Sequence, residues 1–356
     1  MPKLVFDVDF IIFEAVSVAQ EVFITATHKP TGYVQEFKNR TELWGHHGKK
    51  IGGWIGVQNE MSGNTYYKAE DFDVVDGVRP RPFKVVTEPD SPPQYLSPED
   101  GAKNIIDGRI KSICSKLNAT EYIGYTGTGE VFRHKAATLL PYKGHREDLI
   151  TPLLLKDMKK YVQDKHNCKL VTDIEADDAV SIATIEGYKK WKKSGNDEDI
   201  LIAVAVDKDA KQTEGWHFNP DKDESPRLIE GFGKLWLTEK GDVDGCGRMW
   251  LYYQIAVGDT TDNYKSNCFS KIKFASKGGY DALKDCTNDK EAFKALVEVF
   301  KKLYPEPIEV EGCKGKITID WLHVMQEMAT MAMMLRHPED KIDIKAALTK
   351  LGITYG

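Results

Sequence analysis

The sequence has no long uninterrupted hydrophobic run. A helix that spans a bilayer needs about 18 or more predominantly apolar residues. The most apolar N-terminal stretch, residues 4–27, is interrupted by Asp7, Asp9, Glu14 and Glu21. The same acids argue against a secretory signal peptide, whose apolar region carries no charge. We therefore expect neither a membrane-spanning segment nor a membrane partner.

Cysteine is scarce, and basic residues are not in excess. None of the six cysteines belongs to a Cys-x-x-Cys pair, so a disulfide framework or a zinc site built on such pairs is excluded and a cytoplasmic protein with reduced thiols is indicated. The net charge of −6 argues against a uniformly basic coat for nucleic acid, although local basic patches remain open. The 356 residues, 41% of them hydrophobic, suffice for two domains or for one large domain with insertions.

Four apolar runs of strand length alternate with helical patterns. The runs cover residues 3–6, 122–125, 169–171 and 199–206. A helix is expected to start at Ser97-Pro98, because serine caps helices and proline suits their first turn, and another is expected over residues 177–193. This alternation predicts an α/β fold with a mainly parallel central sheet flanked by helices.

Acidic residues follow three of these runs and recur in one later turn. Because the carboxyl ends of parallel strands meet at one edge of a sheet, we expect these side chains to share a cleft. The residues concerned are Asp7 and Asp9; Glu175, Asp177 and Asp178; Asp207 and Asp209; and Asp259 and Asp262. So many carboxylates in one cleft would repel one another unless cations neutralised them.

The carboxylate oxygens are hard ligands that suit Mg²⁺, for which Mn²⁺ can substitute. Two such ions about 4 Å apart can activate a water molecule and stabilise the leaving oxygen when a phosphodiester is cleaved. Basic segments complement the acids: residues 133–169 contain nine lysines and arginines against four acids, and residues 265–277 contain lysines without any acid. Local positive charge of this kind is what contact with nucleic-acid phosphates requires.

Five blocks carry a more specific signal. They are residues 4–9 (LVFDVD), 131–133 (VFR) with 141–146 (PYKGHR), 175–179 (EADDA), 206–209 (VDKD) and 254–263 (QIAVGDTTDN). In this order and spacing the blocks resemble the motifs of the 5′-nuclease superfamily, which includes flap endonucleases. The short gap between Lys143 and Glu175 is most similar to that of the short-arch phage 5′→3′ exonucleases.

The resemblance implies a role for each matching residue. One Mg²⁺ would be bound or framed by Asp7, Glu175, Asp177 and Asp178, and the other by Asp207, Asp209, Asp259 and Asp262. Lys143 and Arg146 would be catalytic, because they would reach the scissile phosphate and stabilise its developing charge. DNA would be bound by Arg133, Tyr142, Lys265, Lys271, Lys273 and Lys277.

The resemblance also implies a domain organisation. Residues 1–258 would form the nuclease core, with a helical arch at about 133–169. Residues 25–96 are rich in glycine, proline, aromatic and polar residues, and this composition is interpreted as an insertion of irregular structure or short β-hairpins. Residues 259–356 would form a mostly helical part that opens with a helix–three-turn–helix and binds duplex DNA. Two departures stand out: residues 125–129 lack an Asp that the family usually has, and residues 274–279 replace its Gly-x-Gly hairpin, which leaves a K⁺ site there open.

These observations predict a monomeric, Mg²⁺-dependent 5′→3′ DNA exonuclease, with flap endonuclease activity possible. Its substrate would be a DNA duplex with a 5′ end, flap or overhang, and its setting phage DNA replication or recombination in the host cytoplasm. One alternative is a PIN-type ribonuclease, which has a similar acidic α/β cleft. The other is a structure-specific DNA-end-binding protein with impaired catalysis, which the missing Asp motivates.

Overall fold

The computed structural model describes residues 2–45, 52–63, 66–85, 92–146 and 149–355. The chain forms two compact units, which are treated separately below. The core unit comprises Met1–Phe10, Ile110–Asp148 and Val162–Gly356, and the insert unit comprises Ile11–Arg109 and Leu149–Tyr161. The boundary predicted after residue 258 falls inside the core unit.

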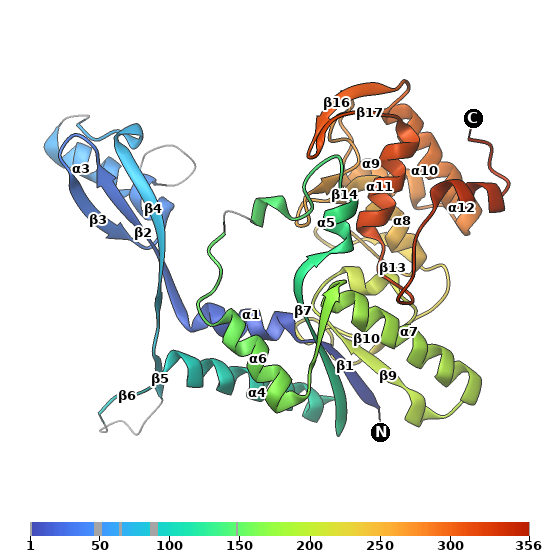
Figure 1. Cartoon of the computed structure of the whole chain (residues 1–356), viewed down its shortest axis with the longest axis horizontal. Helices are drawn as coiled ribbons and strands as arrows, with labels where there is room; N and C mark the ends of the chain where they lie inside the picture. Colours follow the sequence, from blue (N-terminus) through green and yellow to red (C-terminus); the bar gives the residue numbers. More distant parts are fainter. Residues whose placement is uncertain (1, 46–51, 64–65, 86–91, 147–148, 356) are drawn as a thin grey trace. The chain divides into compact units, whose positions relative to one another are not determined.

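A six-stranded sheet organises the core unit (Figure 1). Its order is β11-β10-β9-β1-β7-β8, and all neighbours pair in parallel except β10 and β11. The strands are β1 (Lys3–Asp7), β7 (Glu121–Val131), β8 (Lys169–Asp173), β9 (Leu201–Val204), β10 (Gly215–Phe218) and β11 (Arg227–Ile229). The predicted α/β class with a mainly parallel sheet is confirmed. Three predicted runs lie within β1, β7 and β8, and β9 occupies only the middle of the fourth, residues 199–206. The strands β10 and β11 were not predicted.

The central strand β1 is covered on both faces. Leu4, Val5 and Phe6 have no exposed surface, which explains why the sequence there is continuously apolar instead of alternating. Because β1 lies between β7 and β9, the residues that follow β1 and β9 lie at the same edge of the sheet. This arrangement puts the first and third acidic blocks close together.

Helices and short 3₁₀ turns connect the strands. The predicted start at Ser97 is confirmed, since its hydroxyl accepts from the Asp100 amide at 3.0 Å, and Gly195 ends the second predicted helix in the left-handed conformation with a φ of 64°. The elements are α1 (Asp9–Val18), α4 (Pro98–Lys116), α5 (Phe132–Ala136), α6 (Leu155–His166), α7 (Ala176–Ser194), η3 (Gly144–Arg146), η4 (Asp197–Asp199) and η5 (Asp209–Gln212). Within the described residues, no helix is both long and apolar enough to cross a membrane.

The C-terminal part of the core unit is mostly helical, as expected, but it also contains hairpins. Its helices α8, α10 and α11 pack on one another around buried residues such as Phe300, Met325 and Met328. The helices are α8 (Arg248–Val257), α9 (Ser276–Leu283), α10 (Asp289–Leu303), α11 (Trp321–Ala332) and α12 (Ile344–Lys350). The hairpins are β12 (Lys234–Leu237) with β13 (Val243–Cys246), β14 (Gly258–Asp259) with β15 (Tyr264–Lys265), and β16 (Ile308–Gly312) with β17 (Gly315–Ile319).

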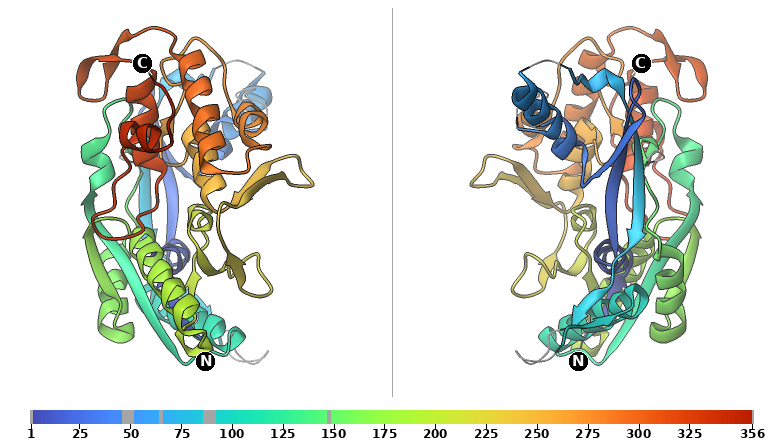
Figure 2. Two further views of the ribbon diagram at one scale, coloured as in Figure 1. Left: turned by 90° about the vertical axis from the view of Figure 1, so that its right-hand side faces the viewer. Right: turned by 90° about the vertical axis from the view of Figure 1, so that its left-hand side faces the viewer.

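The insert unit contains more regular structure than the sequence predicted. The long strands β2 and β4 pair side by side over nine residues and form a three-stranded antiparallel sheet with β3 (Figure 2). Ile24, Leu43 and Ile55 form a small core, against which Trp44 and Trp54 pack. The elements are β2 (Gln20–His28), β3 (Tyr33–Phe37), α2 (Arg40–Trp44), α3 (Trp54–Ser62), η2 (Ala69–Asp71), β4 (Phe72–Pro80), β5 (Phe83–Val85) and β6 (Gln94–Leu96).

Candidate metal centre

Acidic side chains from three segments meet at the carboxyl ends of β1 and β9 and at the start of α7. Asp7 ends β1 and accepts a hydrogen bond from the Asp9 amide at 2.9 Å. Burial and the nearby charges of Asp9, Asp207 and Glu175 raise the pKa of Asp7 to about 7. The predicted convergence of these acidic blocks is therefore present in the structure.

Two further carboxylic acids, Asp177 and Asp209, are buried and form no ion pair with a described residue. Burial, together with the charges of Glu175 and Asp178, raises the pKa of Asp177 well above its ordinary value. Burial and the charge of Asp207 do the same for the pKa of Asp209. Because ionising such groups is costly in a buried site, a divalent cation bound among them would lower that cost.

Glu175, Asp177 and Asp178 form a compact group at the start of α7. Each can offer one oxygen to a common point, and these oxygens lie within 4.8 Å of one another. Asp178, however, is fully buried, and its two oxygens accept from Arg133 at 2.6 and 2.9 Å and from the Leu335 amide at 3.1 Å. Of the three, Glu175 and Asp177 are better placed to bind a metal. Asp178 instead connects the start of α7 to Arg133 and to the backbone of Leu335.

Arg133 has a different position from the one that DNA binding requires. Only 2% of the residue is exposed. Its guanidinium donates to Asp178, to Glu175 at 3.0 Å, and to the Met331 and Met333 carbonyls at 3.1 and 2.6 Å. Burial opposes its charge, but Asp178 outweighs burial and raises the pKa of Arg133. The structure thus favours a role in positioning the carboxylates over the direct DNA contact that the resemblance implies.

Tyr142, Lys143 and Arg146 lie beside Glu175 and Asp262. The Tyr142 hydroxyl is 2.8 Å from an oxygen of each carboxylate, and the Lys143 ammonium donates to Glu175 and lies 3.6 Å from Asp262. The Arg146 guanidinium donates to Asp262 at 3.0 Å and is 43% exposed. Both predicted catalytic cations are therefore at the acidic site. Tyr142, only 4% exposed, is placed to align carboxylates.

The four acids assigned to the second metal are divided in the structure. Asp207 accepts from the Asp209 amide at 2.8 Å, so these two lie together. Asp259 forms an ion pair with Lys208 at 2.7 Å; burial alone would raise the pKa of Asp259, but the hydrogen bond and charge of Lys208 lower it. Asp262 instead lies with Glu175 and Lys143.

The buried hydroxyl of Tyr264 is a second indication that this region binds a ligand. Tyr264 is 3% exposed, and its hydroxyl finds no hydrogen-bond partner among the described residues. Burial, with the charges of Asp209, Asp259 and Asp262, raises its pKa. A buried polar group needs a partner, and water on a metal ion at these acids would supply one. The donor set therefore fits a hard divalent cation such as Mg²⁺ or Mn²⁺.

Sequence reasoning did not assign the residues that hold these acids in place. Asp9 accepts from the Thr126 hydroxyl at 2.5 Å and from the Gly127 amide at 3.1 Å, so a carboxylate from α1 lies where the family's additional Asp was missing. Gln254 donates to Asp209 at 2.5 Å, and its amide oxygen accepts from Gln212. The sequence offered one signal for the contact between Gln254 and Asp209: Gln254 is a single buried glutamine in the otherwise mostly apolar helix α8.

The four lysines predicted to bind the duplex backbone lie after α8. Lys265 is in β15, Lys271 and Lys273 are exposed on the segment that leads into α9, and Lys277 is exposed in the first turn of α9. Lys265 and Lys277 line a cavity of about 860 Å³ that also contains Lys208 and Asp259. This cavity therefore extends from one of the site acids to the basic segment. Gly278 and Gly279 lie within α9, so these residues, which replace the family's Gly-x-Gly hairpin, are helical.

No protein-family model matches the chain, and no curated protein matches it. Among solved structures it is similar to the flap endonuclease of bacteriophage T5 in a pseudo-enzyme–product complex with DNA and metal ions (TM-score 0.40, 15% identity, 69% of this chain and 86% of that chain). It is also similar to the T5 5′-exonuclease with bound divalent metal ions (zinc) (TM-score 0.35, 16% identity, 69% and 79%). Both are of the kind that the sequence blocks resemble, but at TM-scores below 0.5 the likeness carries no argument about activity.

Proposed function

We propose that this protein is a divalent-metal-dependent 5′ nuclease that hydrolyses phosphodiesters near the 5′ ends of DNA. One observation carries the proposal: Asp7, Asp177 and Asp209 are buried acids with raised pKa values in the same acidic site. At that site Lys143 pairs with Glu175, and Arg146 pairs with Asp262. Carboxylates without a counter-ion can bind metal ions, and the adjacent cationic side chains can bind a phosphate group. The five sequence blocks resemble those of 5′ nucleases, and this resemblance supports cleavage from the 5′ end.

The residues fit two Mg²⁺ ions. Glu175, Asp177 and Asp7 would hold one, and Asp207 and Asp209 the other. When bound, such ions supply a Lewis acid for the phosphoryl oxygens and lower the pKa of water. The chain itself supplies positioning: Asp9 is fixed on Thr126 and Gly127, and Gln254 is fixed on Asp209.

Lys143 and Arg146 would bind the scissile phosphate and stabilise the charge that develops on it. In the structure both cations are held by Glu175 and Asp262, with the Lys143 amide also donating to the Asp262 carbonyl at 2.9 Å. Neutralising those carboxylates would release the cations toward a phosphate. The exposed Lys271 and Lys273 would contact the duplex backbone, so replacing both with alanine should weaken DNA binding and reduce its salt dependence.

The experiment uses one linear DNA duplex labelled at either the 5′ or the 3′ end, incubated with protein in Mg²⁺ or in EDTA. We expect short 5′-labelled products and 3′-labelled strands that shorten from the 5′ side, in Mg²⁺ only. Asp207→Asn should abolish both. Full cleavage by Asp207→Asn would remove the role given to the second acidic group.

Two further functions have specific support. A PIN-type ribonuclease would use the same acidic edge, and faster cleavage of a matched RNA would favour it. A DNA-end-binding protein would retain the basic segment with impaired catalysis, and it would shift the duplex on a native gel without cleaving it in Mg²⁺ or Mn²⁺. Asp9, which brings a carboxylate to Thr126, favours the active enzyme over this second alternative.

A further inference from the structure

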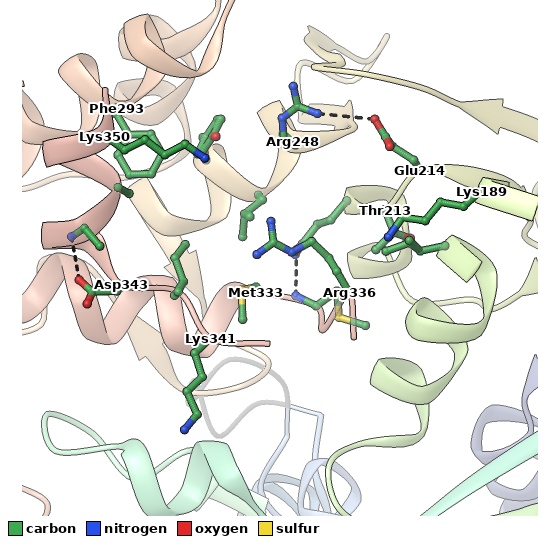
Figure 3. A pocket seen from close by; sticks show the side chains of 18 residues that line it. Lys189, Thr213, Glu214, Arg248, Phe293, Met333, Arg336, Lys341, Asp343 and Lys350 are labelled. Atoms are coloured by element: carbon green, nitrogen blue, oxygen red, sulfur yellow. Dashed lines mark hydrogen bonds and ion pairs between the residues drawn. The ribbon is translucent and has the colours of Figure 1, made fainter. Parts of the chain in front are cut away.

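A cavity of about 510 Å³ lies within the core unit on α7, α8, α10 and α12 (Figure 3). This volume is in the range of about 300–1,000 Å³ that ligand sites occupy. The cavity contains none of the acids or cations assigned to the proposed metal centre. It is therefore a separate feature that the proposed nuclease chemistry does not use.

The rim of the cavity is cationic. Figure 3 shows the side chains of Lys189, Lys341 and Lys350 among those that line it, and all three are exposed. Arg248 and Arg336 also line it, but they pair with Asp289 at 2.9 Å and with Asp340 at 2.6 Å. By contrast, the three lysines form no ion pair with any described residue. Two acids also line the cavity: Glu214, which lies 3.5 Å from Arg248, and Asp343. The cationic side chains of the lining outnumber these acids, so the cavity has an excess of positive charge.

The floor of the cavity is apolar. Leu251, Met333, Met334 and Ile342 contribute to it, with Ala346 at one side. Methionine side chains adapt to apolar groups of different shapes. An apolar floor beneath a cationic rim is complementary to a ligand with an apolar group between negative charges.

The polar groups of the floor do not suit a nucleobase, whose ring edge needs hydrogen-bond partners. The Gln212 amide nitrogen donates to Gln254 and to the Ala332 carbonyl, and its oxygen accepts from the Met334 amide at 3.2 Å. The Thr213 hydroxyl donates to the Ala210 carbonyl at 3.0 Å. Since these groups are already engaged, an aliphatic or aromatic side chain fits the floor better than a base.

The floor is also held in place without a ligand. The Met333 carbonyl accepts from Arg133 at 2.6 Å, and the Met334 amide is fixed on Gln212. Met333 and Met334 are 2% and 4% exposed. A preformed floor lowers the ordering cost of binding.

We propose that this cavity is the docking site for an acidic peptide segment of a partner protein, which inserts one apolar side chain onto the floor and places its carboxylates on Lys189, Lys341 and Lys350. The inference does not rest on the proposed nuclease activity, because none of these residues belongs to that site. It identifies a partner by chemistry: an acidic segment with a leucine, isoleucine or phenylalanine anchor.

The test is an array of heptapeptides with aspartates flanking each possible central residue, probed with the full-length protein. The best binders are then measured by fluorescence anisotropy. We expect saturable binding that requires an apolar centre and is lost when lysines replace the aspartates. Lys341→Glu with Lys350→Glu should weaken it about tenfold or more. Ala346→Trp, which fills the cavity, should do the same.

Lys345→Glu is the matched control, because Lys345 is an exposed lysine on the same helix α12 but lines a different cavity. It should leave binding unchanged. Circular dichroism and DNA cleavage establish that each variant is folded. The proposal is overturned if acidic peptides with apolar centres do not bind, if Lys345→Glu weakens binding as much as the paired reversal, or if thymidine monophosphate displaces the peptide.

Discussion

The carboxylates of the candidate metal centre form two groups that differ in what neutralises them. In the cation-paired group, Glu175, Asp178 and Asp259 each contact a lysine or arginine. Burial alone would raise the pKa of Glu175, but Lys143 and Arg133 outweigh it and lower that pKa. Glu175 and Asp259 have lowered pKa values because the chain supplies their counter-ions.

In the unneutralised group, Asp7, Asp177 and Asp209 form no ion pair with a described residue, and burial raises the pKa of each. A protein that only needed to fold would gain by replacing such groups with neutral ones. The difference therefore separates acids that already have a counter-ion in the protein from acids that have none among the described residues. Variants of each group should fail in different ways.

The largest effect is expected for Asp209→Asn. The asparagine keeps the oxygen that accepts from Gln254 but removes a charge that would hold a metal ion. Losing several kcal/mol of transition-state stabilisation corresponds to a fall of about 10³-fold or more in single-turnover cleavage. The metal-free variant should also melt at a higher temperature than the wild type, because a buried charge is gone.

Asp242→Asn provides the control, because Asp242 is an exposed acid of the same unit. It should change neither cleavage nor melting. Cleavage by Asp209→Asn within tenfold of the wild type would place Asp209 outside the metal-binding set.

Arg133→Met should affect folding more than chemistry. It leaves Asp178 buried without its cation, and removing one partner of a buried ion pair costs about 3–5 kcal/mol. Urea unfolding measures this loss. Adding Asp178→Asn should recover part of it, since the stranded charge is then removed. Arg146→Met, at an exposed arginine, should cost less than about 1 kcal/mol. Equal losses for Arg133→Met and Arg146→Met would contradict the cation-paired interpretation.

The sheet and the position of the acids were predictable because both follow from local sequence. Apolar runs such as residues 3–6 form strands, and an acid after the run, such as Asp7, must lie at the strand's end. The predictions held where residues close in sequence determine the geometry.

The role of Arg133 was not predictable, because it depends on carbonyls of Met331 and Met333 nearly two hundred residues away. Likewise, the bonds from Thr126 and Gly127 to Asp9 cross from one strand to the helix that follows another. The sheet β2-β3-β4 is more extensive than the predicted short β-hairpins. Its extent was not predictable because its strands carry mixed polar and apolar residues, and its small core includes residues of α2 and α3.

A smaller effect on cleavage is expected for Gln254→Leu. This variant tests whether Asp209 must be held in position by its hydrogen bond from Gln254. The substitution removes the donor to Asp209 and the acceptor for Gln212. Losing such an outer partner of a metal ligand costs about 10–100-fold in metal affinity or activity. The readout is the Mg²⁺ concentration for half-maximal cleavage, which should rise.

The control is Gln326→Leu, the same change at a part-buried glutamine whose amide bonds the backbone at Ile342 and Ile344. It should leave the Mg²⁺ requirement unchanged even if stability falls. A rise in that requirement for both variants would show that packing, and not the contact with Asp209, is responsible.

A further comparison uses the melting temperature at different pH values to separate the two groups of acids. The pKa of Asp7 is raised from 3.8 to about 7 in the metal-free fold. The folded state then binds more protons than the unfolded state within this interval, so this contribution to stability falls as pH rises and is fully lost above about 7. Asp7→Asn should remove that slope. We therefore expect the melting temperature of the wild type in EDTA, relative to Asp7→Asn, to decline from pH 4 to pH 7 and then level off.

Mg²⁺ should reverse this decline for the wild type near pH 7, because a bound cation favours ionised Asp7, and it should have less effect on Asp7→Asn. The cation-paired group acts in the opposite direction, since acids with lowered pKa values lose their contribution as pH falls. Taking the difference between the two proteins cancels that contribution and isolates Asp7. A difference that stays constant across the interval, with or without Mg²⁺, would mean that Asp7 is already neutralised and would move it into the cation-paired group.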